Sequence, residues 1–181
     1  MLIDELKNIA RNNGIVGAGG AGFPAYAKMT EKADTVILNC VECEPLLKLH
    51  RQLLATHTEE IIQMLDEVRE SFGAKEAVIG IKSEYVTTIK AIEEVIGDFP
   101  NVRICALKAA YPMGDEVVLI YEATGRVIKP GGLPIDENVV VYNVETMYNL
   151  YRAVHLNIPV TNKLVSIVGE IDHPLTVRVP L

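Results

Sequence analysis

Short apolar runs alternate with longer amphipathic segments along most of the chain. Runs rich in Val, Ile and Leu at residues 35–39, 77–81, 102–107 and 139–142 predict strands. Helical spacing of apolar residues predicts helices at 1–13, 46–72 with a break near 56–58, 84–96, 113–123 and 144–156. Strands that are apolar on both faces and joined by helix-length crossovers are typical of a parallel sheet. The pattern predicts an α/β fold, a Rossmann-like parallel sheet of about four strands with helices on both faces.

The two ends of the chain differ in their patterns. In the first helix, Leu2, Leu6, Ile9 and Ala10 share the predicted buried stripe. Residues 161–181 show strand-like alternation and a His-Pro break, without helical spacing. They predict a short C-terminal β-rich segment, and we interpret it as the start of a following β-rich module that the sequence does not complete.

Composition narrows the classes of function. A chain of 181 residues, 49% of them hydrophobic and none Trp, suits one domain with an aliphatic core. The net charge of -7 argues against binding of nucleic acid or of an anionic membrane surface. No apolar run approaches the roughly 18 residues of a membrane span, and acids stand early in the chain. We therefore expect a cytoplasmic protein without direct membrane insertion.

The cysteines do not indicate a metal site. Cys40 and Cys43 form a CxxC pair, Cys105 stands apart, and the four histidines are scattered. An iron–sulfur cluster needs about four thiolates, and a disulfide framework is not expected from three cysteines. We expect no metal bound within this chain.

Five glycines lie between residues 14 and 22, and the phrase GAGGAGFP occupies residues 17–24. Glycine lets backbone N–H groups approach a ligand, so such loops hold phosphates or line flat cofactors. The GxGxxG spacing is present, but the loop follows a helix and precedes Pro24. A dinucleotide-binding turn follows a strand and opens a helix, so that interpretation fails, whereas a purely structural turn stays open.

Polar residues follow three of the predicted strands. Asn39 ends the first strand, Glu42 and Glu44 follow it, and Asp115 and Glu116 come after the third. After the fourth strand come Asn143 and Thr146. Solvent exposure explains the first group equally well, and helix capping is a sufficient explanation for the others. Together with the glycine-rich loop, they predict a cofactor pocket along one edge of the sheet.

These motifs resemble a known family. GAGGAGFP at 17–24, Lys28, the phrase NCVECEP at 39–45, Gly-Asp-Glu at 114–116 and Asn-Val-Glu-Thr at 143–146 are similar to the flavoprotein family of the respiratory complex I 51-kDa subunit. The match is closer to its branch of Rnf complex C subunits, propanediol-utilisation cobalamin reductases and proline-reductase-associated electron-transfer proteins. The resemblance covers residues 1–160.

The resemblance implies an FMN- and NADH-binding domain over residues 1–160. FMN would accept hydride from NADH and pass electrons to iron–sulfur clusters or a reductase partner outside this chain. The protein would be cytoplasmic, or peripheral to a membrane complex or a microcompartment. The implied cofactor-binding residues are Gly17, Gly19, Gly20, Phe23, Lys28, Asn39, Glu42, Cys43, Gly114, Asp115, Glu116, Asn143 and Thr146, with Glu116 as the catalytic residue.

Three positions depart from the family pattern. Ala18 stands where the family has Arg, Val41 where it has Asp, and Met29 where it has an aromatic residue. An alternative therefore stays open, in which the domain has lost flavin and serves as a non-catalytic scaffold or docking domain.

Overall fold

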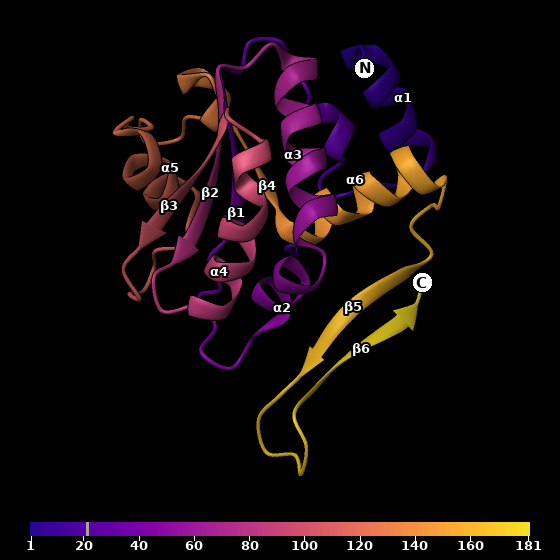
Figure 1. Cartoon of the computed structure of the whole chain (residues 1–181), viewed down its shortest axis with the longest axis vertical. Coiled ribbons are helices and arrows are strands. Elements are labelled where there is room, and N and C mark those ends of the chain that lie inside the picture. Colours follow the sequence, from indigo (N-terminus) through magenta and orange to yellow (C-terminus); the bar gives the residue numbers. More distant parts are fainter. Residues whose placement is uncertain (21) are drawn as a thin grey trace.

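The computed structural model describes residues 1–20 and 22–181, so Ala21 of the glycine-rich loop lies outside the described residues. Parallel strands form one sheet, covered by helices, and an antiparallel hairpin follows (Figure 1). The strands are β1 (Thr35–Cys40), β2 (Glu76–Lys82), β3 (Val102–Leu107), β4 (Val139–Asn143), β5 (Asn162–Ile167) and β6 (Leu175–Pro180). The α-helices are α1 (Ile3–Asn12), α2 (Leu49–Thr56), α3 (Thr58–Phe72), α4 (Val86–Val95), α5 (Glu116–Thr124) and α6 (Val144–Leu156). Short 3-10 helices are η1 (Ala25–Lys28), η2 (Ile96–Asp98) and η3 (Pro134–Glu137).

The sheet has the strand order β3-β2-β1-β4, and every pairing within it is parallel. The chain moves outward from β1 through β2 to β3 and then returns to the opposite side of β1 with β4. Between β1 and β4 the direction of winding reverses, and in open parallel sheets ligands bind beyond the strand ends at such a switch point. The predicted fold class is confirmed, and the topology places its binding crevice at the ends of β1 and β4.

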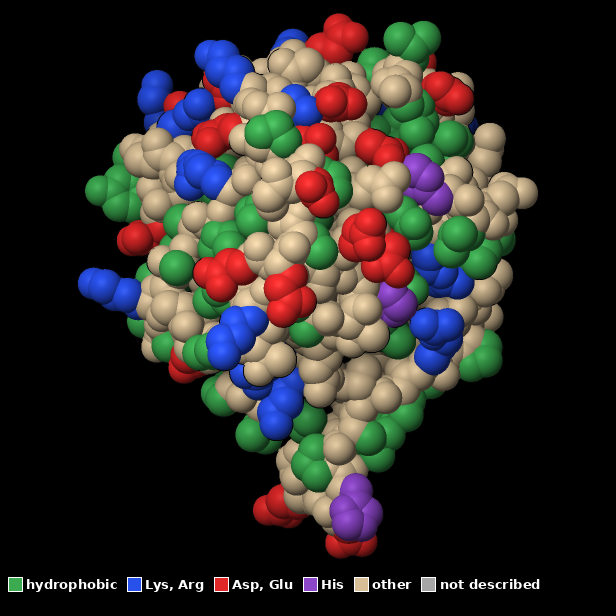
Figure 2. All heavy atoms as spheres, in the orientation of Figure 1, with side chains coloured by type: hydrophobic (Ala, Val, Ile, Leu, Met, Phe, Trp, Pro, Cys, Tyr) green, Lys and Arg blue, Asp and Glu red, His purple; other side chains and the backbone are tan. Residues whose placement is uncertain are grey.

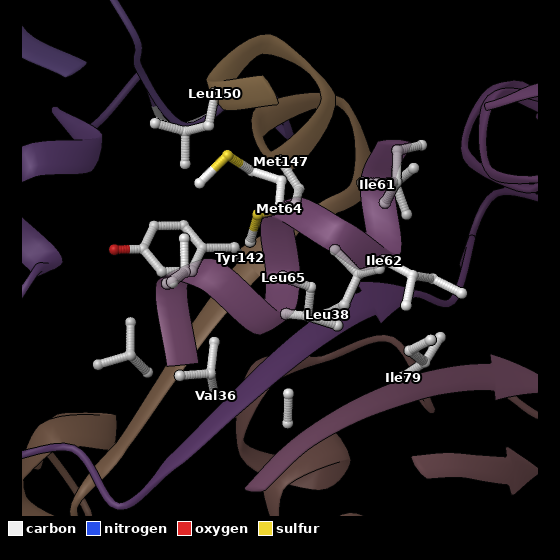
Figure 3. Packing of buried hydrophobic residues seen from close by; sticks show 14 of the residues in the cluster. Val36, Leu38, Ile61, Ile62, Met64, Leu65, Ile79, Tyr142, Met147 and Leu150 are labelled. Atoms are coloured by element: carbon white, nitrogen blue, oxygen red, sulfur yellow. The ribbon is translucent and has the colours of Figure 1, made fainter. Parts of the chain in front are cut away.

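Alternate residues of each central strand enter two hydrophobic clusters. Val36 and Leu38 of β1 point into the larger one, with Tyr142 of β4 and side chains from α3 and α6 (Figure 3). Ile37 and Val141 point into the smaller one, which α5 covers. The helices thus cover both faces, which explains why the strands are nearly continuous apolar runs in the sequence.

Several helix boundaries differ from the predicted ones. α2 begins only at Leu49, because residues 44–47 form a turn in which Leu47 N donates to Glu44 O. α5 begins at Glu116 instead of residue 113, because the Asp115 carboxylate caps it by accepting from Val117 N and Val118 N. Leu2, predicted on the buried stripe of the first helix, is exposed because it precedes α1 with an extended backbone; Ile3 takes its place beside Leu6 and Ala10.

The β5–β6 hairpin extends away from the sheet and its helices (Figures 1 and 2). Its strands pair antiparallel from Asn162↔Pro180 to Ile167↔Leu175, which confirms the predicted C-terminal β-rich segment. Whether residues 161–181 begin a further module stays a prediction.

Within the described part of the chain, none of the helices combines the length and the apolar character that crossing a membrane requires.

Candidate functional site

The glycine loop, described at residues 14–20 and 22–24, lies between α1 and η1, and its two ends are joined by backbone hydrogen bonds. Val16 forms an isolated antiparallel bridge with Pro24, and Gly17 N donates to Phe23 O at 2.7 Å. The turn between them needs φ angles of +119° at Gly20 and +61° at Gly22, in the region that favours glycine. The loop is therefore a tight turn whose ends are fixed by backbone hydrogen bonds.

A first cavity, of about 220 Å³, lies under this loop at the carboxyl ends of β1 and β4. Most of the residues predicted to bind cofactor meet here, although they come from five separate parts of the chain. The lining residues are Gly17, Gly19, Phe23, Ala25, Lys28, Asn39, Glu116, Val141, Tyr142, Asn143 and Thr146. The first cavity thus lies at the switch point of the sheet.

The N-terminus of α6 forms one wall of the first cavity. The Asn143 side chain caps this helix by accepting from Glu145 N at 3.0 Å. The Thr146 hydroxyl accepts from Ala18 N at 3.0 Å and donates to Val16 O at 3.5 Å, so it ties the glycine loop to the helix. A Cβ on Gly19 would lie 3.0 Å from Asn143 Nδ2. The loop packs directly on a helix end that carries partial positive charge, an arrangement suited to an anion.

Asn39, at the end of β1, joins two loops. Its Nδ2 donates to Gly114 O at 3.0 Å, and its Oδ1 accepts from Val41 N at 2.9 Å. A Cβ on Gly114 would lie 2.7 Å from Cys43 Sγ and even closer to Val41 O. The segment after β3 therefore crosses the end of β2 to reach β1, and glycine at 114 permits that close approach.

Lys28 and Glu116 face each other in the first cavity. Lys28 Nζ lies 3.5 Å from Glu116 Oε1 and donates to Val141 O at 3.4 Å. Both side chains keep contact with solvent, so the pair contributes little to folding stability. Its importance lies in placing one cation and one carboxylate on the wall of the cavity.

The remaining predicted residues do not line the first cavity. They are Gly20, Glu42, Cys43, Gly114 and Asp115. Asp115 caps α5, and Gly114 and Cys43 pack where the two loops meet. Their assigned flavin contacts stay predictions.

Glu42 is buried, with 6% of its surface exposed, and its carboxylate faces the start of α2. It accepts from His50 N at 2.9 Å and lies 3.6 Å from Arg51 Nε. Burial raises the pKa of this carboxyl above its usual range, and the hydrogen bond from His50 and the charge of Arg51 oppose that rise. In this conformation Glu42 holds the loop after β1 against α2.

A second cavity, of about 480 Å³, adjoins the first and shares Phe23, Lys28, Glu116 and Val141 with it. Its far side is formed by Ala27, Thr30, Lys32, Leu133, Pro134, Ile135, Val139 and Val140. Sequence reasoning missed this wall because residues 126–138 show neither strand nor helix periodicity; the only signal was the run of Pro and Gly there. The two cavities therefore lie side by side at β4.

Within residues 1–20 and 22–181, no three His, Cys, Asp or Glu side chains gather in a way that would hold a metal ion.

The half-buried His50 should make stability depend on pH. Burial, with the nearby charge of Lys163, lowers the pKa of His50 to about 4. Unfolded His takes up its proton near pH 6.5, so between those values the unfolded state binds more protons and stability falls as pH falls. The loss should approach about 1.4 kcal/mol per pH unit. Chemical denaturation between pH 4 and 7 should show that slope flattened in His50→Gln relative to wild type; parallel curves would contradict it.

Comparison with known proteins identifies the family. The model of the Nuo51 FMN-binding domain matches residues 10–152. The chain belongs to this family. The matched range includes every predicted site residue from Gly17 to Thr146.

Relatives of this FMN-binding domain are longer proteins. Cobalamin reductase PduS of Salmonella typhimurium is 39% identical over 178 residues, covering 98% of this chain and 39% of the relative. The C subunit of the Na(+)-translocating ferredoxin:NAD(+) oxidoreductase complex of Acetobacterium woodii is 33% identical over 181 residues, covering 97% of this chain and 41% of the relative. The chain spans about two fifths of the length of these relatives.

Solved structures share the fold. An NAD+-reducing NiFe hydrogenase in its H2-reduced state matches with a TM-score of 0.81 and 23% identity, over 98% of this chain and 37% of that one. The air-oxidised form of such an enzyme also gives 0.81, with 24% identity, over 98% of this chain and 36% of that one. The hairpin lies inside the aligned region, because the coverage of this chain is nearly complete.

Proposed function

We propose that this domain binds FMN in the first cavity, accepts hydride from NADH through that flavin, and passes electrons to iron–sulfur centres outside the chain. The supporting observation is the packing of the glycine loop on the N-terminus of α6 at the β1–β4 switch point. Membership of the Nuo51 FMN-binding domain family supports the flavin. The second cavity adds room for a donor beside it.

The residues fit the phosphate end of FMN. Asn143, Thr146 and the backbone of the glycine loop surround the start of α6, whose partial positive charge favours an anion. Gly17 and Gly19 keep side chains out of this part of the cavity. Lys28, which pairs with Glu116, adds a positive charge to the lining of the same cavity. These groups would hold the phosphate.

Other lining residues of the first cavity suit the ring system. Phe23, Asn39, Val141 and Tyr142 offer apolar surface and one amide. When bound, FMN supplies hydride acceptance and the release of electrons one at a time. Hydride transfer needs no general acid or base, so the protein's task is to orient the two rings and exclude water.

We assign Glu116 the catalytic position, because it borders both cavities and its carboxylate would face the reacting rings. Lys28 partly neutralises it at 3.5 Å. The remaining negative charge would disfavour added electron density on the ring, which suits a low potential matched to NADH.

NADH is assigned to the second cavity. Its volume, about 480 Å³, is the larger of the two cavity volumes described above. Apolar side chains such as Leu133 and Ile135 would contact a base, and Lys28 and Lys32 would attract the phosphates. The relative from Acetobacterium woodii, a subunit of a ferredoxin:NAD(+) oxidoreductase complex, supports this nucleotide.

Because the relatives are much longer, we place the electron acceptor outside residues 1–181, in an iron–sulfur centre or a reductase partner. The names of the relatives describe a cobalamin reductase and a component of an oxidoreductase complex, and both agree with a domain that hands electrons onward.

FMN titration of the purified chain tests the first step. We expect quenching of flavin fluorescence with one FMN bound per chain, and bleaching of the flavin absorbance on addition of NADH under anaerobic conditions. A colourless chain that neither quenches nor binds FMN would reject the flavin function and favour the scaffold alternative. Binding without bleaching by NADH would reject only the donor.

Leu133→Asp tests the place assigned to NADH. Leu133 lines the second cavity and is 62% exposed, so the substitution should leave the fold intact. A carboxylate would replace the apolar contact with the base, and we expect an apparent KM for NADH raised by about tenfold, equivalent to about 1.4 kcal/mol, with FMN affinity unchanged. Anaerobic stopped-flow reduction measures it.

Val127→Asp is the matched control for that substitution. Val127 is 65% exposed in the same connecting segment, outside both sets of lining residues. Its KM for NADH should equal that of wild type. Equal KM values for Leu133→Asp and Val127→Asp would show that NADH does not use the second cavity.

A further inference from the structure

Glu145 lies between Asn143 and Thr146 in the first turn of α6, but its side chain points to a different part of the molecule. Only 2% of its surface is exposed. Its carboxylate accepts hydrogen bonds from Leu164 N at 3.1 Å and from Lys163 Nζ, both in β5. A buried acid next to two predicted cofactor-binding residues is therefore committed to the C-terminal hairpin.

The hairpin is also held at its root. Val160 N donates to Asn13 O at 3.0 Å, which fixes the start of this segment to the end of α1. Lys163 Nζ donates in addition to Leu164 O at 3.1 Å, so the lysine is held by both partners. Beyond these anchors the hairpin extends away from the sheet (Figure 1). Glu145 thus fixes the base of an element that is otherwise largely exposed.

Breaking the contact between Glu145 and β5 should cost a large amount of free energy. A buried carboxylate that loses its cation or its N–H donor is left uncompensated, which is far more costly than loss of an exposed pair. The first turn of α6 and the start of β5 should therefore move together. Glu145 N also donates to Asn143 Oδ1 at 3.0 Å, so a shift of Glu145 would disturb the cap that borders the first cavity.

We infer that Glu145 is a positioning residue that couples occupation of the first cavity to docking of the β5–β6 hairpin. A ligand at the N-terminus of α6 would order the first turn of this helix. It would thereby strengthen the hydrogen bonds that the Glu145 carboxylate accepts from Leu164 N and Lys163 Nζ. Coupling of this kind is reciprocal, so a docked hairpin would raise the affinity for the ligand by the same factor. Because it requires FMN in the first cavity, this coupling rests on the function proposed above.

Amide hydrogen exchange with and without FMN tests the coupling. In the wild-type chain, FMN should slow exchange across residues 162–167 and 175–180. In Glu145→Ala the hairpin should exchange quickly whether or not FMN is present, and the Kd for FMN should rise by about tenfold. Glu145→Gln, which keeps an oxygen acceptor for Leu164 N, should restore part of both effects. Exchange in β1–β4 should stay slow, which separates this result from general destabilisation.

Glu67→Ala is the matched control. Glu67 of α3 pairs with His155 near the other end of α6 at 3.0 Å, so this variant removes an α6 contact distant from the cavity. It should leave both the Kd and the FMN-dependent protection of the hairpin unchanged. If Glu145→Ala does not fold, Lys163→Met replaces it, with the same expected results.

Two results for Glu145→Ala would overturn the coupling while leaving the flavin function in place. One is protection of the hairpin by FMN that persists in this variant, and the other is a Kd for FMN within about twofold of wild type. A wild-type chain that does not bind FMN would instead overturn the function itself. In that case, slow hairpin exchange in wild type and fast exchange in Glu145→Ala would show that the contact of Glu145 with Lys163 and Leu164 has only a structural role.

Discussion

Gly114→Ala is expected to weaken FMN binding by at least about tenfold, although residue 114 does not line the cavity. The added Cβ would lie 2.7 Å from Cys43 Sγ and closer still to Val41 O, and that backbone oxygen cannot move without its loop. Separation of the two loops would break the hydrogen bond from Asn39 Nδ2 to Gly114 O. Asn39 would then lose its fixed orientation in the first cavity.

The same clash should lower the free energy of unfolding by about 1–3 kcal/mol, the usual cost of overpacking. Denaturant titration gives the stability, and fluorescence quenching gives the Kd for FMN. Gly97→Ala is the control, because a Cβ there meets no atom within 4 Å. If Gly114→Ala binds FMN as tightly as Gly97→Ala does, the contact between the two loops has no influence on the site.

Local sequence patterns were sufficient to predict those features that depend only on the helix, strand or turn in which they lie. Asn143 was predictable as a helix cap because Asn followed by a helical apolar pattern favours that role, and it caps α6. The strands were predictable because both of their faces are buried, which makes them apolar throughout. The glycines at 20 and 22 indicated a tight turn, and the turn uses positive φ at both.

Long-range placement was not predictable in this way. The pattern put Gly114 after a strand, but only the β3-β2-β1-β4 order shows that its loop must cross β2 to reach β1. The sequence around Glu42 would be the same whether its side chain faced the cavity or α2. The hydrogen bond from the backbone N–H of His50 holds it toward α2. Glu145 resembles any acid at a helix start, since Lys163 is distant in the sequence.

Gly19→Val should abolish measurable FMN binding, a loss of about 100-fold or more, while the fold stays intact. A Cβ at residue 19 would lie 3.0 Å from Asn143 Nδ2, and the branched side chain adds two methyl groups in the same narrow space. Asn143 cannot simply rotate away, because its Oδ1 caps α6 through Glu145 N, and loss of a cap costs about 0.5–2 kcal/mol. The glycine loop would lift from the helix instead, breaking the bond from Ala18 N to Thr146 Oγ1 and removing the anion-binding wall. Circular dichroism and denaturant titration should match Gly97→Val, the equivalent change at an open position. FMN affinity equal in the two variants would place the flavin elsewhere than under the glycine loop.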